Sequence, residues 1–274
     1  MPSPQAQLVE THGEPMLLKD KVAIVSGVGP GLGHALCLEL AKQGADVVLA
    51  ARTASRLEEI AGKVRATGRR SLAVPTDMTD AGQAKHLADA TVAEFGKIDI
   101  LVNNAAKNEP FTTLVDSSVE EWRACLDDNV MGHMQTCKYA APYMIERRAG
   151  SIINVSSVSM RKGVGTRSAY SAAKAAIAVM TQSLADELGP HQVRVNCVVP
   201  GHIWGDLLEG YYRKRAEELG VTYDEVYQSF ADQIALRRIP LDTEVAAAIV
   251  FLASDMASAI TGQSLDVNGG LYYH

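Results

Sequence analysis

Three side chains near the middle of the 274-residue chain have types and spacings that suit acid–base chemistry. Tyr170 and Lys174 are four residues apart, and Ser157 lies thirteen residues before the tyrosine. On a helix, a four-residue step places Tyr170 and Lys174 on one face, where the ammonium lowers the pKa of the phenol. Such a hydroxyl can exchange a proton with an alcohol or a carbonyl near neutral pH. The alternative is an ordinary strand, loop and helix with a surface tyrosine and lysine.

A glycine-rich turn separates the first apolar segment from the first helical one. The run VAIV within residues 21–26 is short and β-branched, which predicts a buried strand. Gly27, Gly31 and Gly33 follow, and HALCLELAKQG then has helical periodicity. A strand, a glycine turn and a helix N-terminus form a phosphate site, because glycines permit the tight turn, the backbone approach to a pyrophosphate and close helix packing. A loop that needs glycines only for its shape is the alternative.

The residue after the second predicted strand bears on which dinucleotide fits. The run ADVVLAA ends at Ala51, Arg52 follows directly, and the next acidic residue is Glu58. In dinucleotide-binding folds an acidic residue near this point binds the ribose 2′-hydroxyl, whereas an arginine accommodates a 2′-phosphate. Arg52 therefore favours NADP(H) over NAD(H). A solvated arginine that stacks near the adenine would suit either cofactor.

Apolar runs alternate with helical segments, which predicts an α/β fold with a parallel, doubly wound sheet. Further strands are expected at SLAVPTD and IDILVNNAA, and helices over 53–67 and 80–95. Ligands in such folds bind beyond the carboxyl ends of the strands. The predicted strand ends carry residues suited to a ligand, namely Gly27, Arg52, Asp77, Asn104 and Ser157.

Residues 120–148 read as one long helix with a misfit in its middle. Asn129 and Gly132 are poor residues for a helix interior. Such a misfit can mark a kink or a functional position, and the alternative is a satisfied polar residue in a bent helix. We expect His133, which has apolar neighbours, to be structural.

Composition narrows the classes of function. A formal net charge of -6 argues against nucleic acid or an anionic membrane as the main partner. No apolar run approaches the roughly 18 residues of a membrane span. The four cysteines are scattered without a CxxC pair, which indicates reduced, buried thiols. Residues 1–17 are proline-rich without an apolar signal segment, so we expect a flexible tail and a cytoplasmic protein.

Together these motifs resemble the short-chain dehydrogenase/reductase family, in its single-domain branch. SGVGPGLG is similar to the family's TGxxxGxG loop, DMT to its adenine-contacting acid, and NNAA to its NNAG motif. VVPGHI and SLDVNGG are similar to its PG turn and last strand, so that the resemblance covers residues 18–272. It implies one Rossmann-fold domain over 18–274 with a seven-stranded parallel sheet and helices on both faces. The family's catalytic tetrad falls on Asn129, Ser157, Tyr170 and Lys174.

The resemblance also implies a role for each residue. Tyr170 would be the general acid/base, and Lys174 would lower its pKa and bind the nicotinamide ribose. Ser157 would stabilise the substrate oxygen, and Asn129 would hold the helix break and a water in the proton relay. The nicotinamide would exchange hydride with the carbon that bears this oxygen. The implied cofactor contacts are Gly27, Gly31, Leu32, Gly33, Arg52, Asp77, Met78, Asn104, Ala105, Tyr170, Lys174, Pro200, Gly201 and Ile203.

Residues 202–240 are the least family-like part and correspond to the family's substrate lid. Six aromatic residues there suit a bulky alicyclic, aryl or steroid-like substrate, or else they fix the lid helices to the core or to a neighbouring subunit. The sequence departs from the family at two positions, one in the glycine loop and one in residues 202–240. Pro30 removes a backbone donor from the phosphate loop. Gly205 stands where a threonine often binds the carboxamide.

We expect an NAD(P)-dependent oxidoreductase that interconverts a small-molecule secondary alcohol and a ketone, with no metal. A 3-oxoacyl-carrier-protein reductase is the alternative within that class, and it should have a shorter lid and a basic surface near the cleft. A catalytically inactive nucleotide-binding regulator is another, against which the complete tetrad speaks. An enoyl reductase would space Tyr and Lys by seven. The family's assembly implies a homotetramer through helices at 120–148 and 168–188.

Overall fold

The computed structural model describes residues 16–107 and 111–273, and its strands form one parallel sheet. Within the described residues seven strands pair in the order β3-β2-β1-β4-β5-β6-β7. The order reverses between β1 and β4, which is the switch point of a doubly wound fold. The predicted Rossmann architecture is confirmed. The strands are β1 (Val22–Ser26), β2 (Asp46–Ala51), β3 (Ser71–Pro75), β4 (Ile100–Asn103), β5 (Gly150–Val155), β6 (Val193–Pro200) and β7 (Ser264–Val267).

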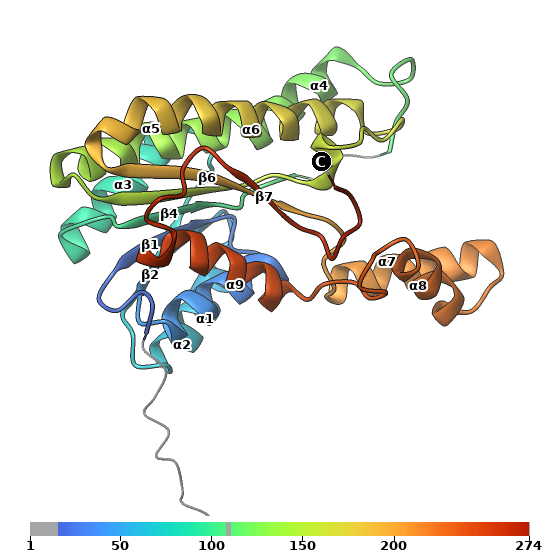
Figure 1. Cartoon of the computed structure of the whole chain (residues 1–274), viewed down its shortest axis with the longest axis horizontal. Coiled ribbons are helices and arrows are strands. Elements are labelled where there is room, and N and C mark those ends of the chain that lie inside the picture. The colour runs from blue at the N-terminus through green and yellow to red at the C-terminus, as the bar shows by residue number, and fades with distance from the viewer. Residues whose placement is uncertain (1–15, 108–110, 274) are drawn as a thin grey trace, which may run out of the picture.

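Helices cover both faces of this sheet (Figure 1). On one face lie α1 (Leu32–Lys42), α2 (Ala54–Arg65) and α9 (Asp242–Ala253). On the other lie α3 (Ala81–Phe95), α5 (Gly132–Arg147) and α6 (Ser168–Leu188). Each face has its own buried aliphatic core, as expected for strands that are covered on both sides. The predicted tail over 1–17 lies outside the described residues except for Met16 and Leu17.

Local capping signals set where several helices begin. Ser118 and Glu121 form a reciprocal capping box at α4 (Val119–Leu126), and Asp80 accepts the Gln83 N–H at 3.0 Å before α3. Thr222 and Glu225 form a second capping box at α8 (Tyr223–Ala231). These side chains bind N–H groups that would otherwise lack a helical partner.

The expected long helix over 120–148 is present as a continuous run from Val119 to Arg147, but its middle is π-helical and not α-helical. Between α4 and α5 lies a π-helical segment, Asp127–Met131. Asn129 lies inside this segment, and Gly132 begins α5. A Cβ atom on Gly132 would lie 3.2 Å from Met78 Cβ, so the glycine lets the helix approach the end of β3 closely. The misfit seen in the sequence therefore marks a real change of helix type.

A chain of buried polar side chains connects α5 to α6 by way of β4 and β5, on the face that both helices cover. Thr136 Oγ1 donates to Asn103 Oδ1 at 2.6 Å, and Asn103 Nδ2 donates to Asn154 Oδ1 at 3.0 Å. Asn154 Nδ2 then donates to Thr181 Oγ1 at 3.0 Å. Buried polar groups that are fully paired specify one arrangement, because any shift leaves one of them unpaired. This chain fixes where α6 lies against β4 and β5.

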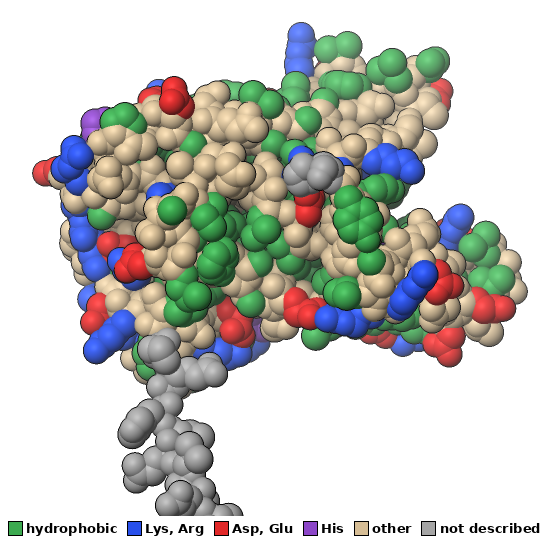
Figure 2. Space-filling model, in the orientation of Figure 1, with side chains coloured by type: hydrophobic (Ala, Val, Ile, Leu, Met, Phe, Trp, Pro, Cys, Tyr) green, Lys and Arg blue, Asp and Glu red, His purple; other side chains and the backbone are tan. Residues whose placement is uncertain are grey.

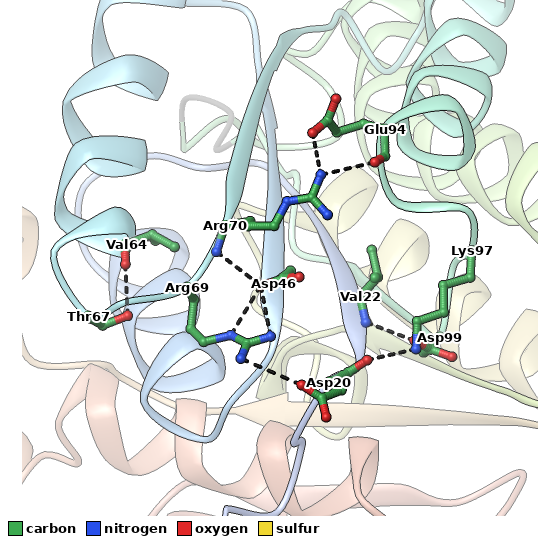
Figure 3. Close-up of polar contacts among 10 residues, drawn as sticks. All are labelled: Asp20, Val22, Asp46, Val64, Thr67, Arg69, Arg70, Glu94, Lys97 and Asp99. Carbon is green, nitrogen blue, oxygen red and sulfur yellow. Dashed lines mark hydrogen bonds and ion pairs between the residues drawn. The ribbon is translucent and has the colours of Figure 1, made fainter.

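Ion pairs and hydrogen bonds fasten the amino ends of the strands, away from the strand ends expected to bind ligands (Figure 3). Asp99 accepts the Val22 N–H at 2.8 Å and Lys97 Nζ at 2.8 Å. Asp46 accepts from the backbone and guanidinium of the Arg69–Arg70 pair. This end of the sheet therefore contributes stability, and the opposite end is left to carry the site.

The lid consists of α7 (Asp206–Leu219) and α8, which project beyond the sheet in Figure 1. Tyr212, Ala216, Val226, Ile234 and Ile239 form a separate hydrophobic cluster in this region. Among the described residues, no helix combines the length and the apolar character that a membrane span needs.

Candidate active site

The glycine turn is the point where three pieces of backbone meet. Gly27 has φ +80°, and a Cβ atom there would lie 2.4 Å from the backbone of Ala105. A Cβ atom on Gly33 would lie 2.5 Å from Gly27 O, which accepts from Asn104 Nδ2 at 2.8 Å. Gly31 also has a positive φ but open space around it. Side chains are therefore excluded between β1, the start of α1 and the end of β4.

The N-terminus of α1 points out of this turn with Leu32 as its first residue. Gly31 is the N-cap and supplies no side-chain acceptor to the first N–H groups. Uncapped N–H groups and the helix dipole together favour an anion at this place. The turn thus fits the pyrophosphate of a dinucleotide.

Arg52 and Asp77 lie at the ends of neighbouring strands. Arg52 follows β2 and is exposed, and Asp77 follows β3. Hydrogen bonds from the Thr79 N–H (3.0 Å) and hydroxyl (2.8 Å) lower the pKa of Asp77, and the positive charge of Arg52 lowers it further. Asp77 therefore stays ionised, and Met78 beside it is buried. An exposed cation at the rim suits a phosphate group.

Tyr170 and Lys174 are brought together on the first turns of α6. Lys174 Nζ lies 5.5 Å from the centroid of the Tyr170 ring, and Lys174 is only 2% exposed. The ammonium donates to Val155 O at 3.1 Å, at the end of β5. The Arg167 guanidinium carbon lies 4.0 Å from the centroid of the same ring. The tyrosine is thus held between two cations in a nearly buried place.

Ser157 lies two residues beyond β5 and begins a short 3₁₀ helix, Val158–Met160. Its Oγ accepts the Ser159 N–H at 3.2 Å, which orients the hydroxyl. Val158 and Met160 pack against Ile177 of α6. Ser157 and Tyr170 therefore belong to two elements that pack on each other.

Asn129 and His133 reach from the helical side to the end of β4, and both are fully buried. Asn129 Nδ2 donates to Cys125 O at 3.0 Å and to Lys107 O at 3.3 Å. His133 Nε2 lies 2.9 Å from Ala105 O. Burial, reinforced by the charge of Lys174, lowers the pKa of His133 to about 3. The histidine that we expected to be structural thus contacts a predicted cofactor-binding residue.

The segment after β6 forms the remaining side of the site. Pro200 ends the strand, and a Cβ atom on Gly201 would lie 3.1 Å from Asn268 Cβ. Ile203 packs against the core that includes α1 and α9. The segment 200–203 therefore packs on the same hydrophobic core as α1, the helix that follows the glycine turn.

The lid aromatics pack mainly on one another. The rings of Tyr212 and Phe230 stack with centroids 4.8 Å apart, and those of Trp204 and Tyr227 meet edge-on at 5.3 Å. Tyr212 is completely buried. This favours the alternative in which the aromatics hold the lid helices, although the partner is the lid itself and not the main core.

The surface is hollowed near the lid, and a pocket lies beside Tyr170. Figure 2 shows the surface hollowed between the lobe formed by the lid and the lobe that carries α4. A smaller pocket next to Tyr170 is lined by Thr112, Leu114, Trp122, Thr166 and Arg167 among others. The two loops that form it are joined by the Thr112 N–H, which donates to Thr166 O at 2.9 Å.

Comparison with known proteins agrees with this geometry. Residues 27–272 match a family model described as Enoyl-(Acyl carrier protein) reductase. The chain is 34% identical over 253 residues to the 3-oxoacyl-[acyl-carrier-protein] reductase FabG of Staphylococcus aureus, covering 92% of this chain and 98% of that protein. The chain belongs to the short-chain dehydrogenase/reductase family. This enzyme is therefore an NAD(P)-dependent oxidoreductase.

Other members of the family are similarly close. The short chain dehydrogenase/reductase astE of Aspergillus oryzae is 36% identical over 256 residues, covering 93% of this enzyme and 95% of that protein. The crystal structure of an NAD+-bound xylitol dehydrogenase superposes with a TM-score of 0.86 at 29% identity, covering 92% of this chain and 99% of that one. Relatives with different substrates thus share nearly the whole fold, so that the family alone does not identify the substrate.

We predict that Gly27→Ala destabilises the fold by more than about 2 kcal/mol, because the added methyl group overlaps the Ala105 backbone at a positive φ. Gly29→Ala is the matched control, since a Cβ atom there meets nothing within 4 Å. Urea unfolding of both variants measures the difference. Equal stability of the two variants would show that the backbone approach at Gly27 is not tight.

We predict that, as the pH is lowered, the free energy of unfolding decreases more steeply in the wild type than in His133→Gln. The pKa of His133 is about 3 in the fold and 6.5 ordinarily, so between these values only the unfolded chain binds this proton. Folded stability is therefore lost as pH decreases from about 6.5, by up to about 1.4 kcal/mol per pH unit. Unfolding free energies at pH 7, 6 and 5 test this, and identical slopes would contradict it.

Proposed function

We propose that this enzyme interconverts a secondary alcohol and a ketone, with Tyr170 as general acid/base. The observation that supports this most directly is the approach of Lys174 Nζ to the nearly buried Tyr170 ring, at the carboxyl end of the strands, where the glycine turn also lies. When bound, the nicotinamide cofactor supplies or accepts the hydride. The chain's own residues have to place the substrate oxygen and move its proton.

The proton chemistry follows from the four side chains. In alcohol oxidation, Tyr170 Oη takes the hydroxyl proton while Ser157 Oγ hydrogen-bonds the same substrate oxygen. The ammonium of Lys174 stabilises negative charge on the phenol oxygen and can bind the ribose hydroxyls. Asn129 holds the π-helical segment in place, from which water can connect Lys174 to solvent. In ketone reduction the same proton moves in the opposite direction.

We propose NADP(H) as the preferred cofactor because Arg52 is exposed at the end of β2, beside the carboxylate of Asp77. The residues implied for the dinucleotide, from Gly27 to Ile203, all lie at the carboxyl ends of the strands or on the elements that follow them. The NAD+ in the xylitol dehydrogenase structure is a property of that protein.

We propose that the substrate is bulky and apolar, but on other grounds than the lid aromatics. Phe111, Leu114 and Val164, in the two loops joined by Thr112 and Thr166, and Leu207 and Tyr211 on the lid are exposed apolar side chains. Exposed apolar patches commonly mark binding surfaces. An alicyclic, aryl or steroid-like alcohol would cover them. Reaction with small linear alcohols alone would contradict this part of the proposal.

A second candidate is 3-oxoacyl-[acyl-carrier-protein] reduction, which the match across 98% of FabG favours. The lid charges speak against a docking surface for an acidic carrier. Arg213 pairs with Glu209, and Arg215 with Glu218 at 3.5 Å, while Arg238 pairs with Glu244 at 2.6 Å. Each of these arginines is thus paired with a nearby carboxylate. Activity on an acyl-carrier thioester above that on simple ketones would reverse this ranking.

We also propose a homotetramer in the cytoplasm. Val119, Leu126, Met131 and Val179 expose apolar side chains on the helical layer of α4 to α6, which suits association of subunits. All four cysteines are buried free thiols, as in a reducing compartment. Sedimentation as a monomer or recovery from an oxidising compartment would contradict the respective statement.

We predict that Tyr170→Phe lowers turnover by at least about 100-fold, since it removes the proton donor and acceptor. Cofactor binding should persist, because the phenyl ring keeps its packing against Cys125 and Ala173. Absorbance of the nicotinamide at steady state measures turnover, and fluorescence titration measures binding. Undiminished turnover would refute the proposed role.

We predict that Arg52→Ala weakens NADPH binding by about 10-fold or more while NADH binding changes little, because charge-assisted bonds to the 2′-phosphate are lost. Arg123→Ala is the control, as this exposed arginine lies on α4. Tighter binding of NADH than of NADPH by the wild type would overturn the preference.

A further inference from the structure

Asn129 and His133 each form one hydrogen bond with the segment that follows β4. Each also has one buried acceptor atom without a partner among the described residues. Their donors bind Lys107 O and Ala105 O at 3.3 Å and 2.9 Å. Asn129 Oδ1 and His133 Nδ1 are buried, and neither has a hydrogen-bond partner among the described residues. Unpartnered buried acceptors are rare in native proteins, and each needs an explanation.

The contact with Ala105 fixes which nitrogen of His133 carries the proton. A carbonyl oxygen can only accept, so Nε2 carries the hydrogen and Nδ1 presents a lone pair. Burial and the charge of Lys174 disfavour the imidazolium, and the ring is neutral at every pH at which the enzyme would work. Nδ1 is therefore a permanent hydrogen-bond acceptor.

Asn129 lies in the π-helical segment, and His133 lies four residues later in the first turn of α5. The buried ammonium of Lys174 is close enough to His133 to affect its pKa. Lys174 is the charged group that faces His133, and one of its three N–H donors binds Val155 O. The helix α6 packs on this region through Ala173 against Cys125 and Val130. Unpaired buried acceptors beside a buried ammonium suit ordered water, which typically makes about three hydrogen bonds.

We propose that His133 is a positioning residue of the proton path: its Nδ1, together with Asn129 Oδ1, holds the water through which Lys174 exchanges protons. This inference rests on the proposed function. In alcohol oxidation, the proton that Tyr170 receives leaves by way of Lys174 and this water. His133 accepts a hydrogen bond from the water throughout, and it neither gains nor loses a proton. No oxidant beyond the nicotinamide is required.

The test compares His133→Leu with His133→Gln. Leucine removes both hydrogen bonds, whereas glutamine keeps one donor for Ala105 O and one acceptor for water. We expect His133→Leu to lower kcat for alcohol oxidation by about 10-fold and to increase the solvent deuterium isotope effect on kcat. The dissociation constant of the cofactor should stay within about twofold, and His133→Gln should recover most of kcat.

Two outcomes would overturn the inference. One is a wild-type kcat and isotope effect in His133→Leu. The other is a parallel loss of cofactor binding and kcat that His133→Gln does not restore, which would indicate a purely structural role. If His133→Leu does not fold, a crystal structure of the wild type decides, because it must show ordered water within hydrogen-bond distance of His133 Nδ1.

The same experiment separates this inference from the proposed function. Tyr170→Phe is measured in parallel with the His133 variants. Turnover by Tyr170→Phe at the wild-type rate would refute the proposed function and with it the inference. An inactive Tyr170→Phe beside a fully active His133→Leu, with an unchanged isotope effect, would refute the inference alone.

Discussion

The end of β4 is held from two sides, and this clamp determines the geometry of the whole site. On one side the Gly27 backbone approaches Ala105 so closely that a methyl group would overlap it. On the other side His133 and Asn129 donate to the carbonyls of Ala105 and Lys107. The segment 104–107 cannot shift toward either neighbour. One stretch of backbone thus adjoins both the proposed dinucleotide site and the proposed proton path.

A second constraint places α6, which carries Tyr170 and Lys174, relative to that clamp. The buried chain from Thr136 through Asn103 and Asn154 to Thr181 connects α5 to α6 by way of β4 and β5. Ser156 Oγ donates to Lys174 O at 2.7 Å, which adds a bond between the end of β5 and the turn that carries the lysine. Because these groups are buried, sliding α6 along its axis would break several hydrogen bonds together. The positions of Tyr170 and Lys174 therefore depend on buried polar residues outside the proposed catalytic set.

Much of this was visible in the sequence because its causes are local. Short apolar runs bounded by glycine or polar residues predicted the strands, and the four-residue step predicted that Tyr170 and Lys174 share a face of α6. Asn129 and Gly132 indicated a disturbed helix, since both are unfavourable in a helix interior.

Other features depend on partners distant in the chain and could not be predicted. The π-helical form of 127–131 is accommodated by the end of β3, where Met78 meets Gly132. His133 looked structural because the sequence does not show that Ala105 O lies opposite its ring. The lid aromatics could be counted but not paired, because stacking of Tyr212 on Phe230 requires the relative placement of α7 and α8.

The separate hydrophobic cluster of the lid has a consequence for how such an enzyme can diversify. Tyr212, Val226 and Ile239 are buried together in a cluster that is separate from the two cores flanking the sheet. The exposed lid residues, such as Leu207 and Tyr211, are not part of this buried cluster. Substitutions at these exposed positions can therefore change the substrate, one residue at a time, while the proposed catalytic residues stay the same.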